Sequence, residues 1–158
     1  MSVTPPSTGV IVQAPVAGRV LPLAEVSDPV FAGGVLGQGV AVEPSGGVLV
    51  APVSGTVVTA FPTGHAFGLK AHDGAEVLVH VGIDTVELEG AGFSRLVEQG
   101  AVVDAGATLG TVDLDAVRAA GYEATTIVVV LNSPDYASIT TVATGDVAAG
   151  DALLVLAR

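Results

Sequence analysis

Two pairs of internal repeats restrict the folds that this chain can adopt. The segment APVAGRVLPL at 14–23 returns as APVSGTVVTA at 51–60. A second pair, GAVVDAGATL at 100–109 and GDVAAGDALL at 145–154, shares the order of glycine, apolar residue, glycine and apolar strand. Repeats of this kind are typical of duplicated supersecondary units, and we expect the fold to contain such a duplication.

The segments between the repeats indicate a protein made of strands. Valine-rich runs of strand length are separated by turn dipeptides such as Ser45-Gly46 and Asp73-Gly74. Many short strands with frequent turn residues are typical of an antiparallel sandwich or barrel. Half of the 158 residues are apolar, which suits a chain that buries a valine-rich core. No apolar stretch approaches the ~20 residues that a membrane-spanning helix needs.

Short helical turns and one domain complete the predicted organisation. One helical turn is predicted over Phe93–Gln99, ending at Gly100, and another over Asp113–Ala120, with Asp113 as the N-cap and Gly121 after its end. No shift in composition marks a second domain, so we expect a single domain over residues 10–158.

The first residues predict neither an anchor nor a signal. Residues 1–9 contain two prolines and no lysine, and we expect a disordered lead-in rather than a membrane-binding helix. They also lack the basic and apolar regions of a secretory signal. The chain has no cysteine, which excludes a disulfide framework, a thiolate metal site and a cysteine nucleophile. We expect a cytoplasmic protein, and the start at Met1 favours a free-standing chain.

The charge balance favours protein partners over nucleic acid. Five lysine and arginine residues stand against sixteen aspartate and glutamate residues, for a net charge of −11. Five scattered basic residues cannot follow a phosphate backbone, so we expect no nucleic-acid partner. An acidic surface favours basic protein partners through electrostatic steering, although acidity can also serve solubility alone.

Two of the three histidines flank one predicted hairpin. The dipeptide Asp73-Gly74 between two strands is a strong signal for a two-residue turn. With that turn, Phe67 pairs with His80 and His65 pairs with Gly82, so both imidazoles point to one face and converge. The alternating valines then pack inward. A three-residue turn would shift the register by one and place the histidines on opposite faces.

The residues alone leave several roles open for this pair. A histidine in an apolar strand is most often a satisfied core residue. A zinc site needs more than two ligands, and Asp84 adds only a His80-x-x-x-Asp84 spacing, without the His-x-His pair of a lysostaphin-type peptidase. A biotinyl or lipoyl carrier would need a lysine at a hairpin tip, whereas Lys70 lies within a predicted strand. His72 is predicted to be a solvated turn residue.

Nucleophilic catalysis is a further role that suits two converging histidines. A neutral imidazole can attack phosphorus through a ring nitrogen and needs no separate base. A second donor must then stabilise the transferring phosphoryl group. His65 is placed for that task, and Thr63 can hold its orientation.

Longer motifs around these histidines point to one family. They are Thr63-Gly64-His65-Ala66-Phe67, GAEVLVHVGIDTVELEGAGF at 74–93, the APVAG and APVSG segments, VFAGGVLGQGVAVEP, and VVVLNSPD at 128–135. Together they resemble the glucose-type enzyme IIA of the bacterial phosphoenolpyruvate:sugar phosphotransferase system, over about residues 10–157. The resemblance implies an all-β fold, a flattened antiparallel sandwich or barrel of the duplicated hybrid motif type.

The resemblance also implies roles for the residues of the site. His80 matches the phosphorylated histidine, His65 the second active-site histidine, and Thr63 its supporting hydroxyl. Asp84 is expected at the rim of the site, and Gly82 is expected to leave space for the phosphoryl group. An apolar docking surface is expected at Val30, Phe31, Val35, Leu36, Phe61 and Leu78.

The partners follow from the same resemblance. The phosphocarrier protein HPr would donate the phosphoryl group, and a cysteine on the IIB domain of a glucose-family membrane permease would accept it. No cofactor is required for that transfer. A regulatory role stays open, in which the unphosphorylated chain binds other proteins and His65 and His80 share a zinc ion with a partner. A zinc hydrolase is the least favoured alternative.

Overall fold

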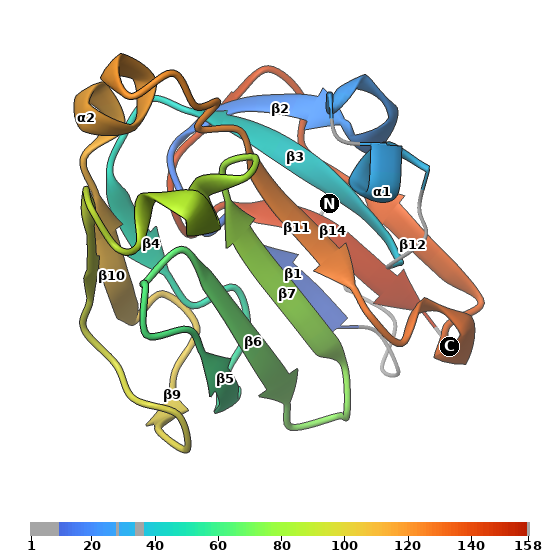
Figure 1. Cartoon of the computed structure of the whole chain (residues 1–158). Coiled ribbons are helices and arrows are strands. Elements are labelled where there is room, and N and C mark those ends of the chain that lie inside the picture. The colour runs from blue at the N-terminus through green and yellow to red at the C-terminus, as the bar shows by residue number, and fades with distance from the viewer. Residues whose placement is uncertain (1–9, 28, 34–36, 158) are drawn as a thin grey trace.

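The computed structural model of the chain describes residues 10–27, 29–33 and 37–157, and for Pro29 and Val30 it describes the backbone alone. The described residues form fourteen strands, two short α-helices and three 3-10 turns (Figure 1). This composition confirms the predicted all-β fold with short helical turns. The predicted lead-in over residues 1–9 lies outside the described residues, and the boundary of a single domain at 10–158 stays a prediction.

The strands follow one another at short intervals along the chain. In order they are β1 (Val10–Gln13), β2 (Gly18–Pro22), β3 (Gln38–Pro44), β4 (Val48–Val50), β5 (Gly55–Ala60), β6 (Ala66–Ala71), β7 (Glu76–Val81), β8 (Phe93–Arg95), β9 (Val102–Val103), β10 (Thr108–Val112), β11 (Thr126–Val130), β12 (Ser138–Thr141), β13 (Asp146–Val147) and β14 (Ala152–Ala157). The helical elements are η1 (Leu23–Glu25), α1 (Pro29–Ala32), η2 (Thr85–Leu88), α2 (Leu114–Ala119) and η3 (Ser133–Asp135).

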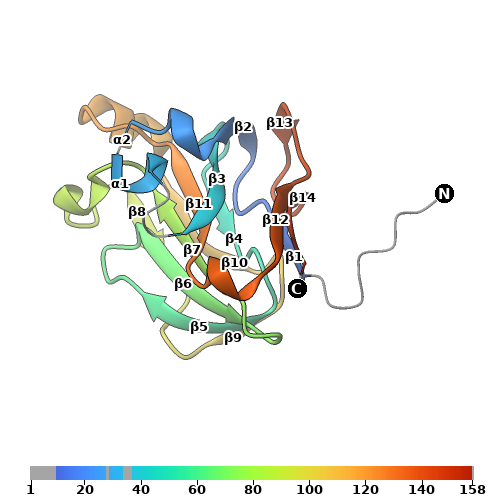
Figure 2. The same cartoon turned by 90° about the vertical axis from the view of Figure 1, so that its right-hand side faces the viewer.

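The strands form one large and two small antiparallel sheets. The large sheet has the order β13-β2-β3-β11-β7-β6-β5-β9, and the small sheets have the orders β1-β14-β12 and β4-β10-β8. Every strand pair in the described part of the chain is antiparallel. Figure 2 shows the β1-β14-β12 sheet along one side of the large sheet. The site described below lies on β7, in the interior of the large sheet.

The sequence repeats occupy equivalent places in the fold. In each copy, the first alanine of the repeat exchanges two backbone hydrogen bonds with a glycine-containing turn of the second repeat pair. These bonds run from Gly150 N to Ala14 O and from Ala14 N to Asp151 O in one copy, and from Gly106 N to Ala51 O and from Ala51 N to Ala107 O in the other. The matched hydrogen bonds confirm the predicted duplication.

The hairpin between β6 and β7 has a three-residue turn, so the predicted two-residue turn is wrong. Residues 72–74 form the turn, and Ala71 N donates to the Ala75 carbonyl at 2.8 Å. The Asp73 carboxylate accepts a hydrogen bond from Ala75 N at 3.0 Å, and Gly74 has a left-handed φ of 102°. A side chain that bonds to its own turn and a glycine in this conformation together stabilise the longer turn.

The longer turn shifts the hairpin register by one, yet the two histidines still converge. His80 lies opposite Ala66, and Val81 N donates to the His65 carbonyl at 2.7 Å. Regular alternation would then turn the two imidazoles to opposite faces. It does not apply to His65, because this residue precedes β6, in a bend where Gly64 has a φ of 77°.

Two apolar clusters lie on opposite faces of the large sheet. Successive side chains of β11 point to opposite faces: Val128 and Val130 pack in the larger cluster, and Ile127 and Val129 pack in the smaller one. His80 lies opposite Ile127 in the β7–β11 register, and therefore on the side of the smaller cluster. The valines of β7 point the other way and are fully buried, as predicted.

One of the two predicted helical turns is present. Helix α2 begins after Asp113, whose carboxylate accepts a hydrogen bond from Ala116 N at 3.0 Å, and Gly121 follows its end with a φ of 90°. The turn predicted over 93–99 is wrong, because Phe93–Arg95 pair with β10 and Phe93 packs against the core. Among the described residues, no helix has the length and hydropathy needed to cross a membrane.

Candidate functional site

His80 lies near the end of β7, and the backbone fixes its protonation pattern. The ring is half-buried and packs against the Phe31 ring, with 5.1 Å between ring centroids. Its Nδ1 atom lies 2.9 Å from the Gly82 carbonyl oxygen. A carbonyl oxygen only accepts hydrogen bonds, so Nδ1 carries the proton and the lone pair of the neutral ring is on Nε2.

His65 lies beside this ring and is almost completely buried. The two imidazoles have a centroid distance of 5.1 Å and an interplanar angle of 83°. Only 2% of His65 is exposed, since Phe61 packs against its ring at 5.1 Å and Phe93 at 6.4 Å. The predicted convergence of the two histidines is therefore confirmed.

Thr63 contacts the second histidine directly. Its Oγ1 atom lies 2.5 Å from His65 Nδ1. A hydroxyl can donate or accept, and when it donates to Nδ1 the neutral ring carries its proton on Nε2. The predicted contact between Thr63 and His65 is present.

Burial keeps His65 neutral at physiological pH. Desolvation, and secondly the positive charge of a protonated His80 nearby, lower the pKa of His65 from 6.5 to about 4. A neutral His65 has one N–H donor and one acceptor, and it does not repel cationic groups that approach the site.

The lowered pKa predicts a stability change with pH. The native state disfavours protonated His65, so the unfolded chain binds more protons between pH 4 and 6.5, and the free energy of unfolding rises with pH in that window. The contribution is fully present above pH 6.5, and about 3 kcal/mol of it is lost as the pH falls to 4. Urea unfolding at several pH values, in the wild type and in His65→Gln, measures it. If the difference in the free energy of unfolding between the wild type and His65→Gln is the same at pH 7 and at pH 4.5, the prediction is wrong.

Gly82 serves the site in a different way from the one expected. A Cβ atom at this position would lie 2.3 Å from Thr85 Cγ2 and 2.7 Å from the Glu123 carbonyl oxygen. The space that the missing side chain leaves therefore faces these two residues and not the imidazoles. The glycine provides a left-handed turn, with a φ of 81°, and a carbonyl that holds His80.

Replacing Gly82 by alanine should destabilise the fold. The left-handed backbone and the overlap with Thr85 and the Glu123 carbonyl together should cost about 3 kcal/mol. Gly106→Ala is a matched control, because Gly106 has a φ of 90° but nothing within 4 Å of the added atom, and should cost about 1 kcal/mol. Urea unfolding measures both changes. Equal losses would show that the close packing around Gly82 has no energetic weight.

Asp84 follows this turn and is exposed. Its backbone is left-handed, with a φ of 59°, and it precedes η2. Tyr122 and Glu87 lie nearby, where the Tyr122 hydroxyl donates to the Glu87 carboxylate at 3.2 Å. Burial, the hydrogen bond to Glu87 and the charges of Glu87 and Asp84 raise the pKa of Tyr122. Asp84 therefore belongs to an acidic border next to the turn that holds His80.

The predicted docking residues differ in their exposure and in their contacts with the two histidines. Phe61 is 37% exposed and presents its ring to His65, whereas Phe31 is buried against His80. Leu78 is half-buried in the smaller apolar cluster. The remaining docking predictions lie outside the described side chains, at Val30, Val35 and Leu36.

Sequence reasoning missed two residues of this site, Phe93 and Thr85. Phe93 contacts the ring of His65, although it was predicted to be helical. Thr85 is completely buried and donates to the Val81 carbonyl at 2.5 Å. The signal that the sequence offers for Thr85 is a hydroxyl residue three positions after the turn glycine, in the motif GIDTVEL.

The described residues contain no group of three or more histidine, cysteine, aspartate or glutamate side chains placed to hold a metal ion. His65 and His80 could supply two nitrogen ligands at most. Further ligands for a shared zinc ion would have to come from a partner, because zinc sites use three or four protein ligands.

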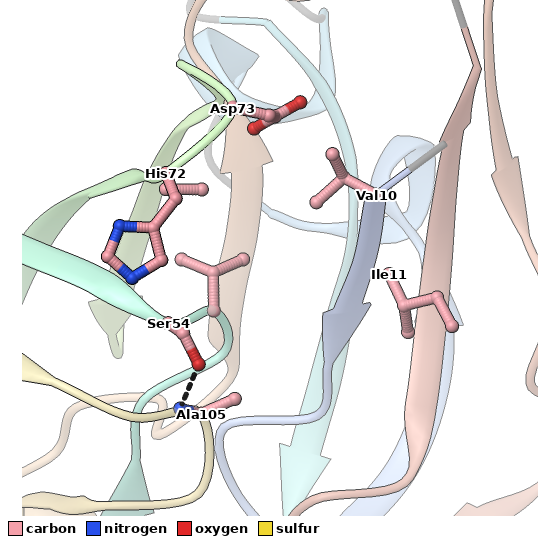
Figure 3. A pocket seen from close by; sticks show the side chains of 8 residues that line it. Val10, Ile11, Ser54, His72, Asp73 and Ala105 are labelled. Atoms are coloured by element: carbon pink, nitrogen blue, oxygen red, sulfur yellow. Dashed lines mark hydrogen bonds between the residues drawn. The ribbon is translucent and has the colours of Figure 1, made fainter. Parts of the chain in front are cut away.

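The third histidine lies apart from the pair. His72 is exposed on the turn between β6 and β7 and lines a hollow of about 250 Å³ together with Ser54, Asp73 and Val10 (Figure 3). Asp73 is engaged elsewhere, since it accepts hydrogen bonds from Ala75 N and from the Tyr136 hydroxyl. His72 is thus an exposed turn residue, as predicted.

Comparisons with known proteins agree with this site. The family model described as phosphoenolpyruvate-dependent sugar phosphotransferase system, EIIA 1, matches residues 10–136. The chain is 52% identical over 136 residues to the glucose-specific EIICBA component of Streptococcus pneumoniae, which covers 86% of this chain and 19% of that protein. It is 45% identical over 128 residues to the glucose-specific EIIA component of Bacillus cereus, which covers 81% of this chain and 78% of that protein.

A solved structure has the same fold. Glucose permease IIA from Mycoplasma capricolum matches with a TM-score of 0.88 and 40% sequence identity, and the match covers 93% of this chain and 95% of that one. Among the relatives, some are much longer. The chain spans about a fifth of the length of the EIICBA component from Streptococcus pneumoniae, and 23% of the β-glucoside-specific EIIBCA component of Dickeya chrysanthemi.

Proposed function

The chain belongs to the glucose-type EIIA family of the phosphoenolpyruvate-dependent sugar phosphotransferase system, and we propose that it carries phosphoryl groups on Nε2 of His80. The observation that carries the proposal is the arrangement of the two imidazoles. They lie 5.1 Å apart, and the Nδ1 atom of each is engaged, one by the Gly82 carbonyl and the other by the Thr63 hydroxyl. This arrangement supports chemistry at the Nε2 atoms.

Phosphoryl transfer to His80 is a direct displacement. The lone pair on Nε2 forms a bond to phosphorus while the bond between phosphorus and the donor's histidine nitrogen breaks, and the donor nitrogen keeps that electron pair. The His80 ring becomes cationic, and its Nδ1–H stays on the Gly82 carbonyl, which stabilises the charge. In onward transfer, a thiolate sulfur attacks phosphorus and Nε2 of His80 recovers its electron pair.

His65 stabilises the group in transfer. Phosphoryl transfer depends mainly on positioning and on donors aimed at the equatorial oxygens. With the Thr63 hydroxyl donating to its Nδ1, neutral His65 presents Nε2–H as such a donor. Burial against Phe61 and Phe93 holds the ring in place, so little reorganisation is needed during the reaction.

HPr is the donor in this proposal, and a cysteine of a IIB domain is the acceptor. The longer relatives, named as EIICBA and EIIBCA components, combine EIIA with EIIB and EIIC, which supports a IIB domain of a membrane permease as the acceptor. The exposed acidic residues Asp84 and Glu87, and the exposed ring of Phe61 that packs against His65, suit partners with an apolar centre and basic surroundings. Both transfers would take place in the cytoplasm, and neither requires a cofactor.

Phosphorylation of the purified chain tests the proposal. Incubation with phosphoenolpyruvate, enzyme I and HPr should add one phosphate that is labile in acid and stable in base, as expected for phosphohistidine. A reaction without HPr is the control and should add none. Incorporation of no phosphate, or of an acid-stable phosphate, would refute the proposal. A zinc ion shared with a regulatory partner remains a separate prediction, which a zinc titration of the two-histidine site would test.

A further inference from the structure

Two consecutive peptide units after His80 are each held at both ends. In the first unit, Gly82 N donates to the Thr125 carbonyl at 2.9 Å, and the Val81 carbonyl accepts from Thr85 Oγ1 at 2.5 Å. In the second unit, Ile83 N donates to the Glu123 carbonyl at 3.1 Å, and the Gly82 carbonyl accepts from His80 Nδ1 at 2.9 Å.

These four hydrogen bonds fix the direction of the Gly82 carbonyl. In a planar trans peptide the N–H and C=O groups point in opposite directions, so an N–H bound to Glu123 aims the Gly82 carbonyl the other way, at His80. The first unit fixes the start of the turn in the same manner. Both peptide planes must be held, because the left-handed Gly82 between them can adopt many other conformations.

Thr85 is the side chain that completes this arrangement. Apart from His80, the other partners of the two peptides are backbone groups, whereas Thr85 contributes its hydroxyl. It is completely buried, and a Cβ atom built on Gly82 would lie only 2.3 Å from its Cγ2 atom. The methyl group of Thr85 therefore packs against Gly82, while its hydroxyl holds the Val81 carbonyl at the start of the same turn.

We propose that Thr85 is a positioning residue for phosphoryl transfer. Thr85 holds the Val81–Gly82–Ile83 backbone so that the Gly82 carbonyl selects the Nδ1–H tautomer of His80. This role rests on the proposed function of His80. That tautomer keeps the lone pair on Nε2, the nitrogen that attacks phosphorus. Without the Thr85 hydroxyl, the turn relaxes, the Gly82 carbonyl leaves Nδ1, and the ring also populates the unreactive Nε2–H tautomer.

Two substitutions separate the hydroxyl from the shape of the side chain. Thr85→Val removes the hydroxyl at nearly constant volume, and Thr85→Ser keeps the hydroxyl without the methyl group. Thr126→Val is the matched control, because Thr126 is also completely buried and its hydroxyl donates to a backbone carbonyl, that of Ala124, which bonds to neither of the two peptide units after His80. Thr85→Ala replaces the valine variant if amide spectra show that the latter does not fold.

The ring tautomer of His80 is the readout that a merely structural role would not move. Nitrogen-15 NMR of the full chain at pH 8 should show the Nδ1–H tautomer in the wild type, in Thr85→Ser and in Thr126→Val. Thr85→Val should show a mixture of the two tautomers. Its rate of phosphorylation by phospho-HPr should fall roughly tenfold to a hundredfold below that of Thr126→Val, the range seen when a partner that orients a metal-bound imidazole is removed.

The possible failures can be told apart. A folded Thr85→Val protein with the wild-type tautomer, or with the same rate as Thr126→Val, would overturn the role of Thr85. So would loss of the Nδ1–H tautomer in folded Thr85→Ser. If the wild type accepts no phosphate from phospho-HPr, the proposed function fails instead, because the tautomer comparison does not depend on phosphorylation.

Discussion

Replacing His80 by glutamine should abolish phosphorylation of the chain by phospho-HPr. Glutamine has no nucleophilic nitrogen, since the lone pair of an amide nitrogen is delocalised, and in the neighbouring His65 Nδ1 is bound by Thr63 while Nε2 carries the proton. Loss of a covalent nucleophile should lower the rate by at least about 1,000-fold. The rate of phosphate incorporation from phosphoenolpyruvate through enzyme I and HPr measures the change.

His72→Gln is the matched control for this loss. His72 is exposed on the turn of the same hairpin and does not contact the pair, so its replacement should leave the incorporation rate unchanged. If His80→Gln still incorporates phosphate at a rate near that of the wild type, the nucleophile has been assigned to the wrong residue.

Replacing His65 by glutamine should separate the two halves of the reaction. The variant keeps the nucleophile and should still accept a phosphoryl group on His80. It should pass the group to a IIB domain about 100-fold to 1,000-fold more slowly, because removing one donor that stabilises charge in a transition state has an effect of that size. Glutamine has nearly the reach of histidine, yet Thr63 can no longer set the direction of an imidazole N–H.

The measurement is a chase of the phosphorylated chain. Phospho-protein freed from HPr is mixed with a IIB domain, and the decay of the phosphohistidine is followed in the wild type and in His65→Gln. Thr63→Val is an informative third protein, because it keeps His65 and removes only the hydroxyl bound to it. Its rate of onward transfer should lie between those of the wild type and His65→Gln. Onward transfer by His65→Gln at the wild-type rate would contradict a stabilising role for His65.

The fold could be predicted largely from the sequence because its repeats and turn residues are local signals. The duplicated APV segments and the glycine turns predicted a duplicated antiparallel fold, and their hydrogen bonds confirm it. The helical turn predicted over 93–99 is wrong for the opposite reason. Its helical pattern is weak, and the pairing of Phe93 with β10 and its packing on the core decide the structure, which no local pattern of this length reveals.

The two histidines converge although the predicted hairpin register is wrong. Asp73-Gly74 predicted a two-residue turn, but the carboxylate of Asp73 bonds to Ala75 N and stabilises a turn of three residues. Strand alternation then fails as an argument for the position of His65. The imidazoles meet because Gly64 bends the chain before β6, a feature that only the three-dimensional structure shows.

The contacts that tune the two histidines were also beyond the sequence. Thr63 could be placed beside His65 because it is two residues away. The hydrogen bond from His80 Nδ1 to the Gly82 carbonyl depends on backbone groups of Glu123 and Thr125 that fix the turn at Gly82. The pairing of β7 with β11 brings these groups together. Carbonyl directions of this kind have no side-chain signal, so they cannot be read from residue types.

The phosphoryl group should be bonded to Nε2 of His80. Phosphorus-31 and nitrogen-15 NMR of the phosphorylated, histidine-labelled chain tests it most directly, through the coupling between phosphorus and the ring nitrogen to which it is bonded. We predict a single phosphohistidine, with phosphorus coupled to Nε2 of His80 and with a proton retained on Nδ1. Phosphorus coupled to Nδ1 of His80, or to either nitrogen of His65 or His72, would contradict it.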